Sequence, residues 1–424
     1  MIERAIAPAF REVENIDLIR AKPIILANGL KVFSIDGGEQ DLVRIEFIFS
    51  NINYDSEKPL QTFATNTMLN DGTSELSSTE IADKIDYYGA FLQTEYANDH
   101  STVTLFTLNK HLANTLPIVK AIISDSNFPQ VELDTLIRNQ KQKLSVSLEK
   151  NDFLSRKTFS KVLFGDTLYG YDVSASDYDQ LDREQLLSYF KQAYQARNCT
   201  VIVSGKVKEN TISLIDNYFG KDWDSALDVQ ENKFNFEVGA GTMHYLERED
   251  ALQSAIRIGQ ISINRIHPDF PALQVVNTIL GGYFGSRLMA NIREDKGFTY
   301  GIGSALVSLK NTGYFFIASE VGADVCSAAL TEIEKEITIL KEELVTEDEL
   351  SLVKNYMLGS MLGSLENSLS HADKFKNIYF SGLDYDYYSR YIHTLRNINV
   401  QEVQAIANKY LSFNSLEKVI VGKK

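Results

Sequence analysis

The stretch LGGYFGSRLMANIREDKGFTYGIGS, residues 280–304, decides how the whole chain is interpreted. Its apolar residues recur at four-residue spacing: Phe284, Leu288 and Ile292. That spacing predicts an amphipathic helix with one apolar face. A lysine followed by Gly297 is typical of a helix end, because glycine tolerates a positive φ. The residues after it are predicted to form a strand.

Two side chains of this stretch carry possible chemistry. Arg293 falls in the last turn of the predicted helix, and Tyr300 falls on the strand that follows it. A planar guanidinium and a phenol at one edge can bind peptide carbonyls or a developing oxyanion. An exposed arginine beside a half-buried strand tyrosine is the ordinary alternative. The residues alone leave both interpretations open.

Composition sets the class of protein. The chain has 424 residues and 44% hydrophobic content, enough for two or three domains with sizeable cores. A net charge of −15 argues against binding to nucleic acid. No signal peptide and no apolar run of about 18 residues are visible, so we expect no membrane association. The expected location is the cytoplasm, and the periplasm stays open because some export routes use no visible signal.

The chain repeats its own layout. A capped helix, a polar turn, a β-branched strand and a Gly-Lys pair occur in residues 182–207 and again in residues 399–424. Repetition over roughly 200 residues predicts duplicated domains rather than a solenoid. We therefore predict an α+β fold of two homologous domains in tandem, each a mostly antiparallel sheet with helices packed on one face. The predicted bounds are a first domain at 1–225, a linker at 226–240 and a second domain at 241–424.

Common catalytic motifs are missing, but a family resemblance is visible. The six histidines form no pair at metal-ligand spacing, and no GxSxG or phosphate-binding loop occurs. The chain nevertheless resembles the insulinase/pitrilysin-like zinc peptidases, the inverzincins, whose active members carry HxxEH on a helix. The segments that carry the resemblance are Asp71-Gly72-Thr73, GAFLQTEYANDHS (89–101), Phe128-Pro129, YDQLDREQL (178–186) and GSRLMANIREDKGFTY (285–300).

The resemblance implies that the zinc site has been lost. The positions that match HxxEH run from Phe63 to Thr67 and place Asn66 where the family has its general base. The position of the distant glutamate ligand holds Lys143. None of these four side chains suits zinc or base catalysis. We therefore expect no cofactor in this chain and no peptidase activity from it alone.

The family's Arg/Tyr pair is matched by Arg293 and Tyr300, whereas the first half has Ile85 and Leu92 at the corresponding positions. Some members of the family divide the site between two chains, one with HxxEH and one with the Arg/Tyr half. The resemblance thus implies a heterodimer with a homologous zinc-bearing HxxEH subunit that acts on unfolded peptides. The alternatives are a structural scaffold and a homodimer that binds peptides without cutting them.

Two further segments are candidates for substrate binding. The family resemblance suggests β-addition of peptide to a strand near Gly89, although plain sheet structure is the alternative. The glycine loop before the predicted helix is the second segment, with a tight turn as its alternative. The candidate residues are Leu92, Gln93, Thr94, Gly281, Gly282 and Gly285.

Overall fold

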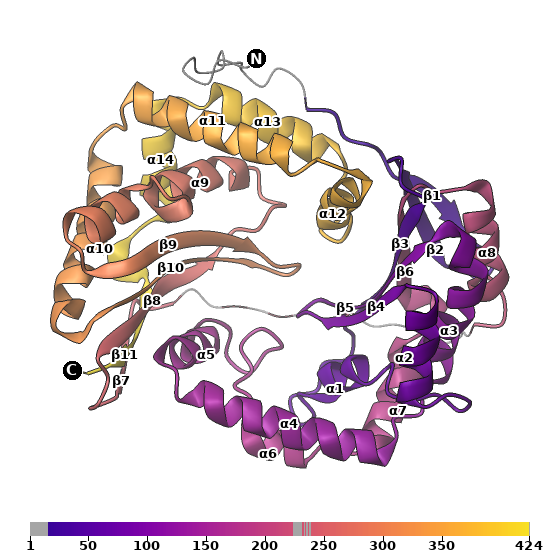
Figure 1. The fold of residues 1–424 in the computed structure, drawn as a ribbon. Coiled ribbons are helices and arrows are strands. Elements are labelled where there is room, and N and C mark those ends of the chain that lie inside the picture. The colour runs from indigo at the N-terminus through magenta and orange to yellow at the C-terminus, as the bar shows by residue number, and fades with distance from the viewer. Residues whose placement is uncertain (1–15, 224–230, 233, 235, 237–238, 424) are drawn as a thin grey trace, which may run out of the picture.

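The computed structural model describes residues 16–223, 231–232, 234, 236 and 239–423. Two β-sheets lie on opposite sides of the molecule, with helices packed around both (Figure 1). The predicted α+β class is confirmed. Most of the predicted linker, residues 226–240, lies outside the described residues, so the domain bounds stay a prediction.

The first sheet has six strands in the order β1-β2-β6-β3-β5-β4. Only β2 and β6 pair in parallel; the other neighbours are antiparallel. The apolar pattern of residues 23–35 predicts one long strand, but Gly29, at φ +85°, turns the chain there and makes two strands. The strands are β1 (Lys22–Ile25), β2 (Lys31–Asp36), β3 (Leu42–Ser50), β4 (Phe91–Tyr96), β5 (His100–Leu108) and β6 (Cys199–Gly205).

The second sheet repeats this arrangement without a counterpart of β1. Its order is β7-β11-β8-β10-β9, and only β7 and β11 are parallel. Gly89 and Gly297 both have positive φ, +58° and +66°, and each precedes the edge strand of its sheet. The strands are β7 (Met243–Glu247), β8 (Gln253–Ser262), β9 (Thr299–Ser308), β10 (Gly313–Gly322) and β11 (Glu417–Gly422).

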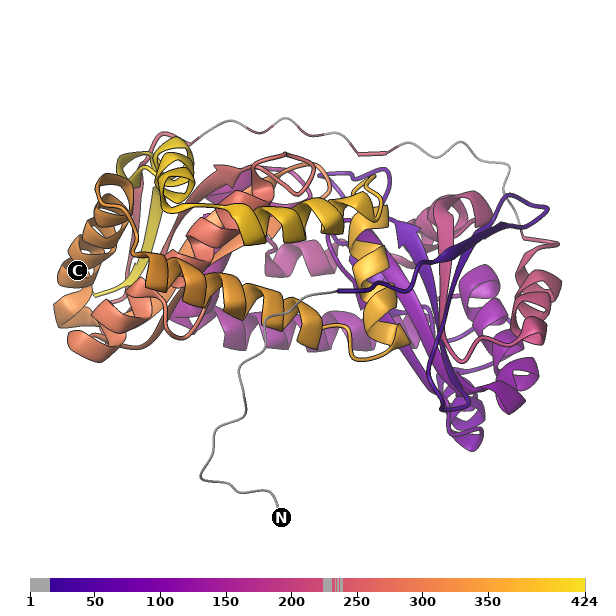
Figure 2. The ribbon, with the colours of Figure 1, turned by 90° about the horizontal axis from the view of Figure 1, so that it is seen from above.

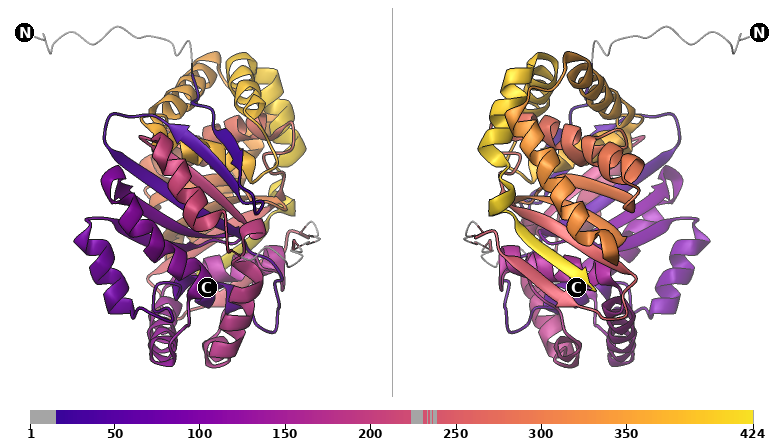
Figure 3. Two further views of the ribbon diagram at one scale, coloured as in Figure 1. Left: turned by 90° about the vertical axis from the view of Figure 1, so that its right-hand side faces the viewer. Right: turned by 90° about the vertical axis from the view of Figure 1, so that its left-hand side faces the viewer.

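Helices of the same half cover one face of each sheet. In the two end views α8 lies over the first sheet and α10 over the second (Figure 3). All the helices of the first half, including α5, which covers the other sheet, are α1 (Gln61–Thr67), α2 (Ser78–Tyr87), α3 (Leu112–Asp125), α4 (Gln130–Leu148), α5 (Asn151–Phe164), α6 (Ala175–Asp179), α7 (Arg183–Ala193) and α8 (Glu209–Phe219). Those of the second half are α9 (Phe270–Asn277), α10 (Cys326–Glu342), α11 (Glu347–Gly363), α12 (Ser368–Tyr379), α13 (Asp386–Asn397) and α14 (Val400–Tyr410). Among the described residues no helix is both long and apolar enough to cross a membrane.

The opposite face of each sheet is covered by a helix from the other half. Phe375 and Ile378 of α12 share a core with Ile48 of β3, while Phe159 of α5 packs with Val419 of β11. Seen from above, α11 and α13 run side by side toward α12 at the first sheet (Figure 2). The sequence pattern had not indicated these exchanged helices, because periodicity shows that a face is apolar but not what covers it.

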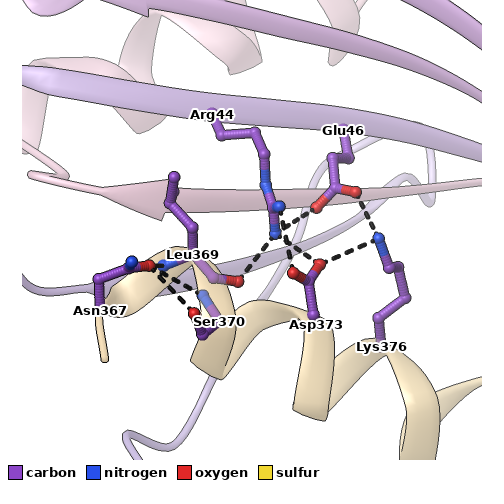
Figure 4. Close-up of polar contacts among 7 residues, drawn as sticks. All are labelled: Arg44, Glu46, Asn367, Leu369, Ser370, Asp373 and Lys376. Carbon is purple, nitrogen blue, oxygen red and sulfur yellow. Dashed lines mark hydrogen bonds and ion pairs between the residues drawn. The ribbon is translucent and has the colours of Figure 1, made fainter. Parts of the chain in front are cut away.

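Buried charges anchor α12 to the first sheet (Figure 4). Arg44 donates to Asp373 at 2.9 Å and to the carbonyl oxygen of Leu369 at 3.0 Å. It also lies 3.0 Å from Glu46, whose other oxygen accepts from Lys376 at 2.6 Å. Two cations and two carboxylates thus form a neutral cluster between the halves, with only 10% of Arg44 and 4% of the Glu46 side chain exposed.

Candidate functional site

Arg293 and Tyr300 lie close together at one end of the second sheet. The guanidinium carbon of Arg293 is 5.9 Å from the centre of the Tyr300 ring and 4.8 Å from that of Phe284. Tyr300 is 93% exposed. In the described part of the chain the only ion pair of Arg293 is a long one, 3.8 Å to Glu294. The guanidinium N–H groups and the phenol are therefore available to an acceptor outside the chain.

A π-helical segment, Met289–Asp295, presents Arg293. The amide of Lys296 bonds to the carbonyl oxygen of Asn291, five residues back, instead of four as in the predicted α-helix. The side-chain amide of Asn291 also donates to Glu332 and Glu336, at 2.8 and 2.7 Å. These bonds tie the segment to α10 and hold the position of Arg293 on the surface.

The predicted apolar stripe is right at two of its three positions. Leu288 and Ile292 are fully buried. Phe284 is 66% exposed, because it precedes the helix and its ring faces the Arg293 guanidinium. An aromatic face attracts a cation, so Phe284 belongs to the exposed Arg293–Tyr300 surface rather than to the core.

A second arginine of the same stretch has a structural role. Arg287 donates two hydrogen bonds to Glu349, at 2.8 and 2.7 Å. These bonds raise the pKa of the Arg287 guanidinium above its ordinary value. This bidentate pair commits Nε and Nη2 of Arg287 to a carboxylate of its own chain, which distinguishes it from Arg293. The sequence alone could not separate the two arginines, since the partner of Arg287 lies 62 positions away in the chain.

The turn after the π-helical segment offers a stability test. Gly297 has φ +66°, and a Cβ there would meet nothing within 4 Å. Gly297→Ala should therefore lower the free energy of unfolding by about 1 kcal/mol through backbone strain alone. Gly301→Ala is the matched control, since its Cβ also meets nothing and its φ is not positive. Equal effects of the two substitutions in urea unfolding would contradict this explanation.

The four positions matched to the family's zinc site hold side chains with other contacts. Phe63 packs edge-on against Tyr96, with ring centres 5.7 Å apart. Asn66 is fully buried and donates to the Tyr194 hydroxyl at 3.1 Å. Thr67 is half-buried, and Lys143 is exposed on α4.

These residues do not fit a zinc ion. Phe63 offers no donor atom, Thr67 offers only a neutral hydroxyl, and the Lys143 ammonium is a cation. Within residues 16–223, 231–232, 234, 236 and 239–423 no group of three His, Cys, Asp or Glu side chains could hold a metal. Any chemistry of this chain at this position therefore has to rely on groups other than a zinc ion held by these residues.

An aromatic cleft of about 490 Å³ occupies this region instead. Its walls come from α1, α4 and α5; Gln140 and Leu144 of α4 line it, whereas Lys143 does not. Burial raises the pKa of Tyr54 to about 12, so this phenol stays neutral at ordinary pH. The aromatic lining residues are Tyr54, Phe63, Tyr96, Phe153, Tyr169, Tyr171 and Tyr178.

The predicted substrate-binding residues lie in two places. Leu92, Gln93 and Thr94 are on β4, which is an edge strand paired only with β5. Such a strand leaves backbone groups available for β-addition.

The loop glycines lie in the second half and have different surroundings. A Cβ at Gly281 would be 2.6 Å from the Ser304 hydroxyl, and one at Gly285 would be 2.9 Å from the Tyr283 ring. These two glycines are required by close packing. Gly282 instead lines a cleft of the second half.

The fold and site together define a class of protein. Two repeated α+β halves, with an exposed Arg/Tyr pair in the second, match the layout implied by the family resemblance. Residues 180–357 match the family described as the Peptidase M16 inactive domain. The resemblance to the insulinase-like M16 peptidases is thereby confirmed.

Relatives with curated names extend over most of the chain. The "Uncharacterized zinc protease YmxG" of Bacillus subtilis is 23% identical over 80% of this chain and 82% of its own. The "Non-peptidase homolog YmxG" of Helicobacter pylori is 22% identical over 84% and 83%. A crystal structure of a peptidase M16 inactive domain from Pseudomonas fluorescens has a TM-score of 0.85 at 22% identity, covering 95% of this chain and 98% of that one. At this identity the structural likeness shows the fold alone.

Proposed function

We propose that this chain is the zinc-less subunit of a two-chain metallopeptidase and supplies Arg293 and Tyr300 to the site of a zinc-bearing homologue. The observation that carries the proposal is the pair itself, an exposed tyrosine beside a half-buried arginine. Tyr300 is 93% exposed and lies beside an arginine whose only ion pair among the described residues is 3.8 Å long. Such donors gain most from an acceptor supplied by another molecule.

The position of the pair supports a site shared between two chains. The turn between β9 and β10 contacts the first half, where the Lys310 amide donates to Asp99 at 3.0 Å. Tyr300 is at the other end of β9. In the described part of the chain no hydrogen bond, ion pair or cation–π contact joins Arg293 or Tyr300 to the first half. The rest of the site would therefore come from a partner.

The proposed chemistry uses only donation from this chain. Arg293 would hold a backbone carbonyl of an extended peptide through its fork of N–H groups. Tyr300 would donate its hydroxyl proton to the scissile carbonyl oxygen as negative charge develops there. The partner's zinc would supply the activated water. The edge strand β4 would add backbone bonds that do not depend on sequence, which suits unfolded peptides.

The test is reconstitution. The chain is co-expressed with a homologue that retains HxxEH, the complex mass is measured by size-exclusion chromatography with light scattering, and turnover of an unfolded fluorogenic peptide is followed. We expect a heterodimer, turnover only when both chains are present, and zinc only in the partner. Full activity of the zinc-bearing chain alone would overturn the proposal and leave this chain a scaffold. A stable homodimer that binds the peptide without turnover would assign it to peptide binding instead.

A further inference from the structure

A second cleft lies in the second half, between α9, α11, α12 and α13. Its volume is about 380 Å³, within the range of ligand sites. Tyr356, which is 46% exposed, stands at its rim. We call it the cationic cleft and define it by six of its lining residues: Arg265, Gln274, Asn277, Tyr356, Lys374 and Tyr388.

The charges of this cleft have one sign. Arg265 and Lys374 are its only charged lining residues, and no ion pair forms with either among the described residues. Arg265 uses one N–H group to bond the Asn377 carbonyl oxygen at 2.7 Å, while its Nε is buried without a partner. Burial lowers the pKa of Lys374, and the Arg265 cation lowers it further, against the opposing effect of Asp373. The carboxylate of Asp373 is engaged by the Arg44 cluster.

The aromatic cleft of the first half provides an internal comparison. It too is lined by two cations, Arg156 and Lys157. Each lies near a carboxylate: Arg156 is 3.3 Å from Asp152, which also pairs with Arg257, and Lys157 pairs with Asp172. Both cations of the aromatic cleft therefore have a carboxylate at ion-pair distance, whereas neither Arg265 nor Lys374 has one among the described residues. Partly buried cations without an ion pair are costly, and the cost falls when an anion binds.

Neutral side chains beside Arg265 and Lys374 indicate which other chemical groups the bound anion would carry. The side-chain oxygens of Gln274 and Asn277 are buried and accept no hydrogen bond from the chain. Such acceptors suit N–H donors on a ligand. The rings of Tyr356 and Tyr388 supply apolar surface nearby. A carboxylate, one or two amide N–H groups and an apolar side chain occur together at the carboxyl end of a peptide.

We propose that the cationic cleft binds the C-terminal carboxylate end of a peptide, with Arg265 and Lys374 on the carboxylate and Gln274 and Asn277 on the backbone N–H groups. The chain would do this without a partner, so the proposal is independent of the Arg293–Tyr300 function. Peptide hydrolysis creates such a carboxylate. The cleft would thus retain a cleaved peptide or recognise a chain end.

The test uses isothermal titration calorimetry on the full chain alone. The probes are acetyl-Ala-Ala-Phe with a free carboxylate, the same peptide as its C-terminal amide, and inorganic phosphate. We expect the acid to bind at least about tenfold more tightly than the amide, and Arg265→Gln or Lys374→Gln to weaken it about tenfold or more. Arg156→Gln in the aromatic cleft is the matched control and should leave acid binding unchanged.

Urea unfolding of the Lys374 variant distinguishes a role of Lys374 in binding from a role in stability. Lys374→Gln removes a partly desolvated charge that forms no ion pair among the described residues, so its urea midpoint should match or exceed that of the wild type while acid binding falls. Any one of four results would overturn the proposal. The acid peptide does not bind, the amide binds as tightly as the acid, phosphate binds as tightly as the acid, or Arg265→Gln and Lys374→Gln leave the affinity for the acid unchanged.

Discussion

Tyr300→Phe in the reconstituted two-chain enzyme should lower kcat for peptide hydrolysis about 10²–10³-fold, the usual effect of removing one oxyanion donor. The substitution deletes a single hydroxyl that forms no hydrogen bond in the described part of the chain, and it keeps the ring, 93% exposed, beside Arg293. Folding and assembly should therefore be unaffected. The measurement is steady-state kinetics on an unfolded peptide with both chains at saturating ratio.

Two further variants test whether a loss of kcat in Tyr300→Phe is specific to this hydroxyl. Tyr87→Phe removes the hydroxyl of another exposed tyrosine, 82% exposed on α2, and should leave kcat unchanged. Arg293→Lys keeps the charge but loses the planar fork, so it should raise KM for the peptide. If Tyr300→Phe turns over peptide at the wild-type rate, Tyr300 does not serve the reaction.

Arg44→Ala should lower the free energy of unfolding by about 3–5 kcal/mol, because it leaves two carboxylates, one of them buried, sharing a single cation between the halves. The Glu46 side chain is only 4% exposed, and Lys376 would be its one remaining cation. Asp373 would lose Arg44, its closest cation. Lys141→Ala is the matched control. It removes a pair with Asp179 whose side chains are 37% and 59% exposed, and such surface pairs are worth about 1 kcal/mol or less.

Urea unfolding followed by two probes measures this effect. Trp223 is the only tryptophan and is buried in the first half, so its fluorescence reports on that half, whereas far-UV circular dichroism reports on both. Because α5 and α12 are exchanged, we expect the two transitions to coincide in the wild type. A loss below about 1 kcal/mol in Arg44→Ala would show that the cluster contributes no more than a surface pair.

Local signals in the sequence predicted much of the fold. The apolar pattern of residues 112–125 by itself predicts a helix with the observed bounds, because it needs no long-range information. The caps Asp182 and Asn399 were also visible, and both accept the predicted backbone hydrogen bonds, from Gln185 and Glu402. The π-helical turn at Met289–Asp295 was missed, since one extra residue in a turn leaves the apolar spacing nearly unchanged.

By itself, then, the sequence determined the two-fold repeat, the family resemblance and the side chains at the zinc-site positions, because each depends on residue type and spacing along the chain. Only the tertiary structure decided which arginine of residues 280–304 is free, which helix covers each sheet, and which cations lack a counter-ion. Arg287 meets Glu349, Arg44 meets Asp373, and Lys374 meets no carboxylate among the described residues. Such pairings join positions up to 329 residues apart, and no local pattern encodes them.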